Sequence, residues 1–276
     1  MYMFSQEVLD VLFRDHKLDT DRLNKKLNMS GEGSLVSIPP HTYVGRVETN
    51  YSDESKVLLL GINPKYSKEE KYQSVNVDLP TNCINQYNKT KNAESLRPLF
   101  EFQEGYFLRE ERNKRHFTKF GNWFGRHWFG KTYGSGGSMG AQRVLDKHVV
   151  EMDVLQYFSD RAQIDSELLA QIAKTDPALL SHRMLIESVI ERIQPLWIQV
   201  NGKSCWKLME SYLFDSPGIS INPTTDTKTE LIVGMATIGT WSGPVLMHKF
   251  LNQSGPQRKD QQDEIAVMWD EWRMKQ

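Results

Sequence analysis

An uncharged polar side chain at the end of an apolar run is the first candidate for chemistry in this sequence. Residues 56–62 are almost wholly apolar and are followed by Asn63 and Pro64. Such a block, closed by turn residues, predicts a strand that is buried on both faces and stops at the proline. Gly61 lets the backbone turn or approach a ligand closely. Because ligands bind at the carboxyl ends of strands in open α/β sheets, we expect Asn63 at a binding edge.

A second candidate is a basic segment with interleaved aromatic residues. Residues 107–133 contain seven Lys and Arg against two Glu, together with Phe and Trp at short intervals from Phe117 to Phe129. A basic groove with aromatic platforms is what a nucleic-acid strand with an unstacked base requires. The alternative is an amphipathic helix whose aromatic side chains enter the core while its charges face solvent.

The elements that position these residues follow an alternating pattern in the second half of the chain. We expect strands at 149–154, 195–200 and 230–236, helices at 181–193 and 204–214, and a final helix that begins at Pro244. Strands that alternate with helices imply parallel pairing. The expected fold class is therefore α/β, a three-layer α/β/α arrangement with a central, mainly parallel four-stranded sheet.

Parallel pairing predicts that several turns converge. Asn63, Tyr157, the Asn201–Gly202 pair and residues 239–243 each follow an expected strand. The carboxyl ends of parallel strands meet at one edge of a sheet, so these four turns are expected to share a crevice.

The remaining segments fit one domain over residues 1–276. Residues 1–50 form an expected N-terminal extension of one or two short helices and a loop. Residues 65–148 form an insertion-rich segment, of which 65–90 is polar and irregular and is expected to be a long loop.

Composition limits the classes of function. The net charge is −1, so the chain as a whole does not attract nucleic acid and any basic surface is local. Two cysteines argue for a reducing compartment and exclude a four-cysteine iron–sulfur cluster. No histidine spacing is typical of zinc, so we expect no metal and no cofactor. The start lacks signal-peptide features and no segment has membrane-span length, so we expect a cytoplasmic or nucleoid-associated monomer that is not secreted.

Three motifs resemble the uracil-DNA glycosylase superfamily. The run Gly61-Ile62-Asn63-Pro64 after a core strand resembles the first motif of its mismatch-specific branch. Residues 191–203 match the helix, Pro-aliphatic strand and Gly-Lys turn common in these enzymes. Residues 150–159 match a strand that ends in an aromatic residue and then Ser.

The resemblance implies a metal-free DNA glycosylase that hydrolyses the N-glycosidic bond of a flipped, uracil-like or modified base and leaves an abasic site. The partner is DNA, single- or double-stranded, with an extruded base. Asn63 holds the attacking water, and Thr240 and Ser242 complete the catalytic set. The implied base pocket comprises Gly61, Ile62, Pro64, Tyr66, Tyr157 and Trp241. The implied DNA-binding residues are Arg112, Lys114, Arg115, Lys119, Arg126 and Lys203.

The sequence departs from the family pattern at the second motif, normally His-Pro-Ser or Asn-Pro-Ser after the last strand. Residues 236–244 supply Ser242, but no His or Asn precedes it. This departure leaves room for a different base or for loss of catalysis. Two alternatives therefore stay open, a catalytically silent DNA-binding protein on the same fold and an α/β enzyme that acts on a small nucleotide.

Overall fold

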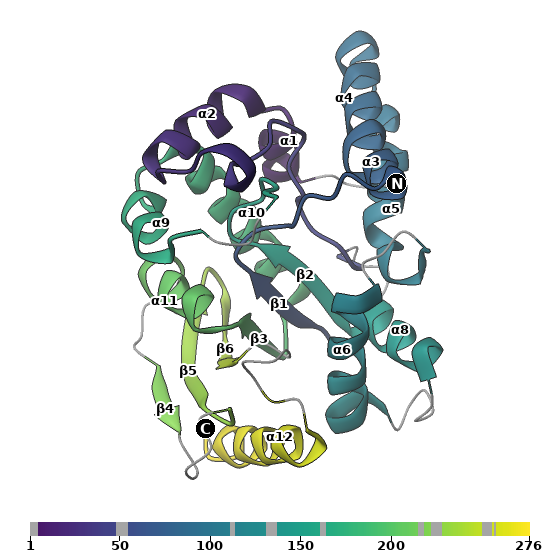
Figure 1. Ribbon diagram of the computed structural model, residues 1–276. Coiled ribbons are helices and arrows are strands. Elements are labelled where there is room, and N and C mark those ends of the chain that lie inside the picture. Colours follow the sequence, from purple (N-terminus) through teal and green to yellow (C-terminus); the bar gives the residue numbers. More distant parts are fainter. Residues whose placement is uncertain are drawn as a thin grey trace.

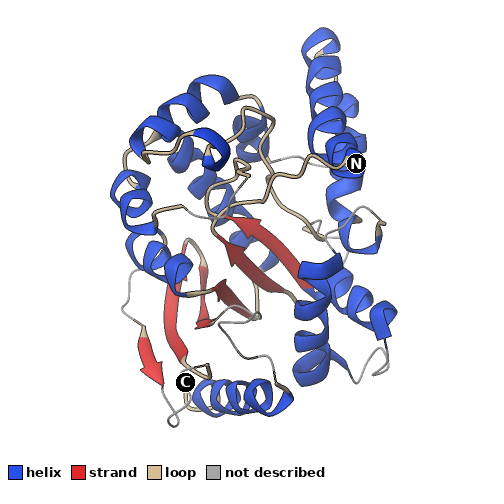
Figure 2. Ribbon diagram, in the orientation of Figure 1, coloured by secondary structure: helices blue, strands red, loops and turns tan. Residues whose placement is uncertain are grey.

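The computed structural model describes residues 5–47, 55–110, 114–130, 137–160, 164–214, 218–221, 228–249, 256 and 258–276. Its centre is a six-stranded sheet with helices on both faces (Figures 1 and 2). The strand order is β2-β1-β3-β6-β5-β4. The strands are β1 (Val57–Gly61), β2 (Val149–Asp153), β3 (Trp197–Asn201), β4 (Ile219–Ile221), β5 (Leu231–Ile238) and β6 (Trp241–His248).

The expected fold class is confirmed. Strands β2, β1, β3 and β6 are mutually parallel neighbours, and β5 and β4 extend the sheet with antiparallel pairing. The sheet thus has four parallel strands, as expected, and two more than the expected total. The buried runs at 57–60 and 149–153 explain this pairing, because parallel strands need apolar cover on both faces.

The identity of the fourth parallel strand differs from the sequence prediction. The expected helix at Pro244 is wrong, since residues 241–248 form β6 and make a hairpin with β5 in which Pro244 pairs with Met235. Gly239, at φ 56°, permits the tight reversal. Val245, Leu246 and Met247 are all buried. Such a continuous apolar run suits a central strand better than a helix with one buried side.

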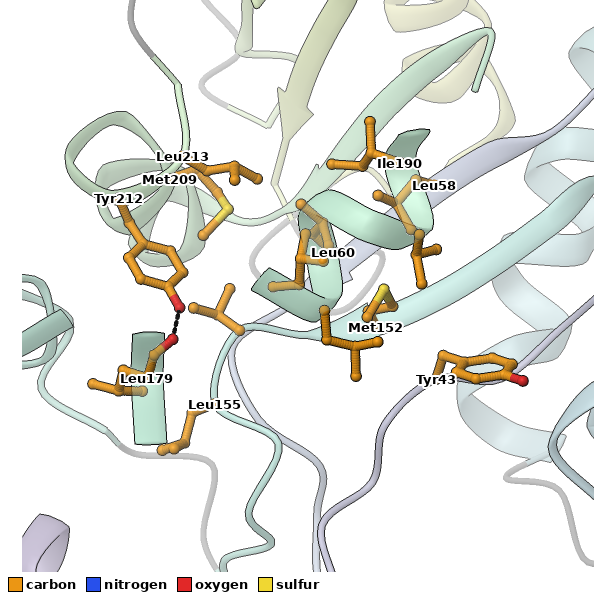
Figure 3. Packing of buried hydrophobic residues seen from close by; sticks show 14 of the residues in the cluster. Tyr43, Leu58, Leu60, Met152, Leu155, Leu179, Ile190, Met209, Tyr212 and Leu213 are labelled. Atoms are coloured by element: carbon orange, nitrogen blue, oxygen red, sulfur yellow. Dashed lines mark hydrogen bonds between the residues drawn. The ribbon is translucent and has the colours of Figure 1, made fainter. Parts of the chain in front are cut away.

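Side chains alternate between two cores, one on each face of the sheet. Leu58 and Leu60 face the first core (Figure 3), while Val57 and Leu59 face the second. The first core is covered by α1 (Gln6–Leu12), α2 (His16–Lys26), α9 (Ser166–Ala173), α10 (Pro177–Ile193) and α11 (Lys203–Tyr212), and the second by α6 (Lys114–Phe124), α8 (Gly137–His148) and α12 (Lys259–Arg273).

The expected long loop at 65–90 is wrong, because most of it is helical. It contains α3 (Glu70–Gln73), the π-helix η3 (Ser74–Asp78) and α4 (Leu79–Thr90), followed by η4 (Ala93–Leu96), α5 (Arg97–Glu104) and η5 (Tyr106–Leu108). Val75, Leu79, Cys83 and Tyr87 recur at intervals of four and pack against the cores. This periodicity was the available signal, masked by the polar residues between them.

One or two short helices are expected at the N-terminus; the structure has two, α1 and α2, and the chain after them borders the sheet. Residues 35–45 run beside β2, where Val44 exchanges backbone hydrogen bonds of 3.0 and 2.9 Å with Glu151. Leu35 makes a similar isolated bridge to Ser159. The segment after η1 (Gly31–Gly33) therefore covers the outer edge of β2, which would otherwise present unpaired backbone groups.

The aromatic residues of the basic segment belong to the second core. Trp123 is 1 % exposed, and its ring lies 5.3 Å from Trp128 and 5.0 Å from His248, measured between ring centroids. The interpretation of these rings as stacking platforms for bases is wrong, and the amphipathic-helix alternative is confirmed. The buried members are Phe117, Phe120, Trp123, Phe124 and, in η6 (Gly125–Phe129), Phe129. Among the helices that the structure describes, none is long and apolar enough to cross a membrane.

We predict that Trp123→Ala lowers the free energy of unfolding by about 3–5 kcal/mol, because it empties a large site in a closely packed core. Urea denaturation followed by circular dichroism measures the change. The control is Asn122→Ala, exposed on the same helix and expected within about 0.5 kcal/mol of the wild type. Equal stability of the Trp123 variant and the wild type would contradict its place in the core.

Candidate functional site

Asn63 is positioned by pairing that continues beyond the ends of β1 and β2. Val154 N donates to Gly61 O at 3.0 Å and Leu155 N to Ile62 O at 2.8 Å. Ser159 N then donates to Pro64 O at 3.1 Å. The turn after β1 is thus held against the chain that follows β2, at the carboxyl edge of the parallel strands, as the sequence predicted for Asn63.

The side-chain amide of Asn63 is oriented by two hydrogen bonds that its nitrogen donates. Its Nδ2 donates to Ser159 Oγ at 2.7 Å and to Pro64 O at 3.3 Å. Both amide hydrogens are therefore used, and Oδ1 has no hydrogen-bond partner among the described residues. The side chain is half-buried, so this oxygen is an oriented acceptor near the surface. Such an atom can hold a water molecule or a ligand N–H.

Two buried carboxyl groups lie beside the end of β1. Asp153 pairs with Gly61 in the sheet, and Glu151 lies two residues earlier on the same face. A Cβ atom on Gly61 would come 2.3 Å from Asp153 Oδ1 and 3.9 Å from Glu151 Oε1. The glycine at position 61 therefore leaves the space that the Asp153 carboxyl occupies.

The pKa values of both carboxyl groups are raised. Burial raises the pKa of Asp153 to about 7. Burial, with the charge of Asp153 in addition, raises the pKa of Glu151 well above its ordinary value. No Lys or Arg among the described residues forms an ion pair with either group. The pair therefore retains a proton near neutral pH, which favours one acceptor and one donor side by side.

Further polar groups continue along the same face. Gln199 Nε2 lies 2.8 Å from His248 Nε2, and His248 Nδ1 lies 2.6 Å from Lys249 O. Burial lowers the pKa of His248 to about 4, so the ring is neutral at physiological pH. The amide oxygens of Gln199 and Asn201 have no partner in the described part of the chain. The carboxyl half of the sheet thus carries several buried polar groups on this face.

The predicted turn into α11 is confirmed. Gly202 adopts φ 89°, a conformation that favours glycine, and α11 begins at the next residue, Lys203. The first amides of α11 are therefore at the carboxyl edge, where a helix N-terminus favours negative charge. Lys203 itself is exposed and lies 2.5 Å from Glu230, measured Nζ to Oε2.

Of the predicted base-pocket residues, those next to Asn63 lie at the same edge. Ile62 is half-buried and packs against the first core, and Pro64 is buried. Tyr66 is tied to the same turn, since its N donates to Ser159 O at 2.8 Å and its hydroxyl to Gln73 Oε1 at 3.2 Å.

Tyr157 occupies a different place from the one predicted. Its side chain is fully buried, and its hydroxyl donates to Asp19 Oδ2 at 2.9 Å. Burial, together with the Asp19 charge, raises the pKa of Tyr157. Arg14 and Arg22 also bind Asp19. Tyr157 therefore anchors α2 to the sheet and does not face Asn63, because its ring turns into the first core.

The predicted convergence fails for residues 239–243, which lie at the opposite edge of the sheet. Because β5 is antiparallel to β6, the turn between them comes at the amino ends of β6 and β3. Thr240 N donates there to Glu191 Oε1 at 3.2 Å, and Trp241 Nε1 donates to Pro195 O at 2.8 Å. Ser242 Oγ lies 3.2 Å from Thr237 Oγ1. Thr240, Trp241 and Ser242 are thus connector residues, separated from Asn63 by the length of the strands.

The structure describes only some of the predicted DNA-binding residues. Arg112 and the side chains of Lys114 and Arg115 lie outside the described residues. Lys119 and Arg126 are exposed, and Arg126 Nη1 donates to Gln262 Oε1 of α12 at 3.2 Å. Their exposure is compatible with phosphate contacts.

One group of side chains could hold a cation. Ligand atoms of His41, Glu151 and Asp153 lie within 4.8 Å of one another. Burial lowers the pKa of His41 to about 4, so its ring is neutral, as a metal ligand must be. Sequence reasoning missed this group because residue 41 meets residue 151 only through the segment beside β2. The available signal was a pair of acids, two apart, inside the apolar run of 149–153.

Comparison with models of known protein families gave no match, and a search of curated proteins found none with a similar sequence. The site is therefore interpreted from its own geometry and from the motifs of the sequence.

We predict that Asp153→Asn raises the stability of the fold at pH 8 and leaves it nearly unchanged at pH 4. The unfolded carboxyl loses its proton near pH 4, whereas the folded one keeps it up to about pH 7. The native state then binds more protons between these values, so wild-type stability falls as pH rises through this window. Denaturant unfolding at pH 4, 6 and 8 measures the effect, expected to be roughly 2–4 kcal/mol.

Asp176→Asn is the control, for which we expect the opposite change in stability at pH 8. Burial alone would raise the pKa of Asp176, but hydrogen bonds from Arg22 and Lys26 lower it to about 2. The ionised carboxylate therefore stabilises the fold above about pH 4, and its loss lowers stability at pH 8. A destabilised Asp153 variant at pH 8 would show that its carboxyl is ionised and compensated.

Proposed function

We propose that this chain is a DNA glycosylase, a monofunctional enzyme that hydrolyses the bond between a flipped base and its deoxyribose. The observation that carries the proposal is Asn63, whose two amide hydrogens are bound while its oxygen remains an oriented acceptor at the carboxyl edge. The Gly-Ile-Asn-Pro run around it resembles the first motif of the uracil-DNA glycosylase superfamily. The hydrogen-bond geometry and the sequence motif independently support Asn63 as the residue that holds the water.

The chemistry follows from what an amide can do. Asn63 Oδ1 accepts a hydrogen bond from water and directs the water oxygen at C1′ of the extruded nucleotide. An amide is a poor base, so the bond to the departing base breaks ahead of water attack. Water then adds to the sugar cation, and its proton leaves with the base or through solvent. The rate consequently depends on stabilising the leaving base, since donors aimed at developing charge contribute roughly 3–4 kcal/mol each.

The second motif belongs after the last parallel strand, and that strand is β6. The sequence after His248 reads Lys-Phe-Leu-Asn-Gln-Ser, in which Asn252 and Ser254 have the spacing of Asn-Pro-Ser. Residues 250–255 lie outside the described residues, so this assignment rests on sequence order alone. It replaces Thr240 and Ser242 as the proposed source of leaving-group stabilisation.

DNA remains the proposed partner because basic residues gather in one segment of a sequence with a net charge of −1. With the aromatic rings in the core, the case for DNA rests on charge and not on stacking. The burial of the aromatic rings also favours a second candidate, an α/β enzyme that acts on a small nucleotide. Assays with free deoxynucleosides beside DNA separate the two.

We expect Asn63→Ala to abolish base release while DNA binding stays within about twofold. The substitution removes the acceptor that holds the water and leaves the phosphate contacts intact. Single-turnover incubation with base-modified oligonucleotides, followed by alkali, measures release as strand breaks. Asn252→Ala, in the same assay, is expected to slow release by roughly 10²–10³.

The matched control is Asn122→Ala, an exposed asparagine on α6 that is expected to retain the wild-type rate. Wild-type release by the Asn63 variant would remove the basis of the proposal. Release from deoxynucleosides but not from DNA would favour the small-nucleotide enzyme.

The basic segment generates a separate prediction. Each phosphate contact releases condensed counterions, so log affinity falls with log salt by about 0.7–0.9 per contact. Replacing Arg112 and Arg115 with Ala should therefore flatten the slope by about 1.4–1.8 and weaken binding equally for all sequences. The control removes Lys25 and Lys275, which are exposed elsewhere. An unchanged slope in the arginine variant would show that DNA does not contact this segment.

A further inference from the structure

Three side chains that can bind a metal ion meet at the carboxyl end of β2, the outer strand of the sheet. Glu151 and Asp153 are two residues apart on this strand, so their side chains lie on the same face. His41 comes from the segment beside β2, in which Val44 pairs with Glu151 and His41 N donates to Gln156 O at 2.8 Å. Backbone pairing thus brings an imidazole from the N-terminal part of the chain to two carboxyl groups of the sheet.

The spacing of their ligand atoms suits a single cation. One atom from each of the three side chains lies within 4.8 Å of the other two. The centre of an equilateral triangle with 4.8 Å sides is about 2.8 Å from each corner, whereas protein atoms bind Zn²⁺ at about 2.0–2.2 Å and Ca²⁺ at about 2.3–2.6 Å. A contraction of less than about 1 Å per ligand therefore closes the group around one ion.

Buried atoms in this group have no hydrogen-bond partner. Glu151 is 7 % exposed, and its Oε2 is without a partner among the described residues, as is the buried Nδ1 of His41. Buried polar atoms without partners are costly, and a cation binds the lone pairs of oxygen and of imidazole nitrogen alike. A proton shared between the two carboxyl groups would leave the His41 nitrogen without a partner, so it explains less of the arrangement.

The charge of the group also matches a divalent cation. Two ionised carboxylates carry two negative charges, and no Lys or Arg in the described part of the chain forms an ion pair with Glu151 or Asp153. Buried charges in proteins are paired or coordinate metals. A dication between the two carboxylates would leave the group neutral.

The group lies close to the surface at the edge of the sheet. His41 is only half-buried, and so is Gly61, which pairs with Asp153. Gly61 has no side chain, and a Cβ atom there would come 2.3 Å from Asp153 Oδ1. The glycine therefore keeps one side of the carboxyl group free of side-chain atoms, and an ion, unlike a larger ligand, requires no wide cavity to reach it.

We propose that His41, Glu151 and Asp153 bind one divalent cation, which fastens the segment beside β2 to the carboxyl end of the sheet. An imidazole with two carboxylates favours Zn²⁺ and its neighbours in the first transition row, since Mg²⁺ and Ca²⁺ prefer oxygen ligands. The inference goes beyond the proposed glycosylase activity and does not depend on it. It departs from the expectation of no metal, which the histidine spacing suggested. The rise in stability predicted for Asp153→Asn at pH 8 is therefore a property of the metal-free protein.

Calorimetric titration tests the site in the full chain, first stripped with EDTA and dialysed into metal-free buffer. We expect one equivalent of Zn²⁺ to bind, at least about 100-fold more tightly than Mg²⁺ or Ca²⁺. Loss of an outer partner of a ligand typically costs about 10–100-fold in metal affinity, so Glu151→Gln and His41→Ala should each cost about 100-fold or more. The matched control is His16→Ala, which removes a half-buried histidine outside the group and should keep the wild-type affinity. Circular dichroism confirms that each variant is folded.

Two measurements on the wild-type protein locate the ion without any substitution. Bound Mn²⁺ should broaden the backbone amide resonances of Val44 and Gly61 and leave those of β4 sharp, because β4 is five strands from β2, at about 24 Å. The Val44 amide donates to Glu151 O at 3.0 Å. If the ion fastens this segment, saturating Zn²⁺ should slow hydrogen exchange at Val44 at least tenfold, because opening the segment then requires release of the metal.

One equivalent of Zn²⁺ that is lost in both ligand variants and kept in His16→Ala supports the site, as do broadening and slowed exchange at Val44. If the folded wild type binds neither Zn²⁺ nor Mn²⁺, or if both ligand variants keep its affinity, the inference is overturned. Should the ligand variants not fold, the wild-type measurements decide. Sharp Val44 and Gly61 resonances in saturating Mn²⁺, or exchange at Val44 that Zn²⁺ does not change, would then refute the inference.

Discussion

The site depends on backbone pairing that continues beyond the ends of β1 and β2. The hydrogen bonds from Val154 and Leu155 to the end of β1, and from Ser159 to Pro64, hold two turns together that are almost a hundred residues apart in the chain. Without them, Asn63 would follow β1 into a flexible turn and its amide would have no fixed orientation. Pro64 contributes because it lacks an N–H and offers only its carbonyl to the pairing. The position of one amide oxygen is thus set by main-chain pairing together with the hydroxyl of Ser159, which holds the Asn63 amide nitrogen.

The two edges of the sheet differ in character. The carboxyl edge collects Asn63, Asp153, Asn201 and the start of α11, whereas the amino edge carries the β5–β6 turn, fixed by Glu191 and by the carbonyl of Pro195. This division follows from a single hairpin. Had β5 been parallel to β6, a crossover helix would have brought residues 239–243 to the carboxyl edge. The hairpin instead places the end of β6, at His248, at the same edge as the other candidate residues.

Sequence reasoning located four of the six strands and the position of Asn63 after the first, because buried parallel strands leave an unmistakable apolar block such as 57–60. It failed where a local sequence pattern is compatible with two different structures. The run Val245-Leu246-Met247 suits a strand or a buried helix, and only its pairing with β3 decides. The rings of Trp123 and Phe124 suit a core or a stacking platform, and burial decides. The carboxyl pair was overlooked because its significance comes from Gly61, a residue on another strand that contributes space and no side chain.

The segment beside β2 has a consequence for how the protein is made. Val44 pairs with Glu151, so this segment leaves the ribosome before β2 and has to wait for a partner that is made roughly 100 residues later. At about 5–20 residues per second, this delay is roughly 5–20 s. Contacts of such large sequence separation also slow folding, because the loop must close before the pairing is gained. The N-terminal region therefore completes its fold late, and the outer edge of β2 is open to wrong partners until it does.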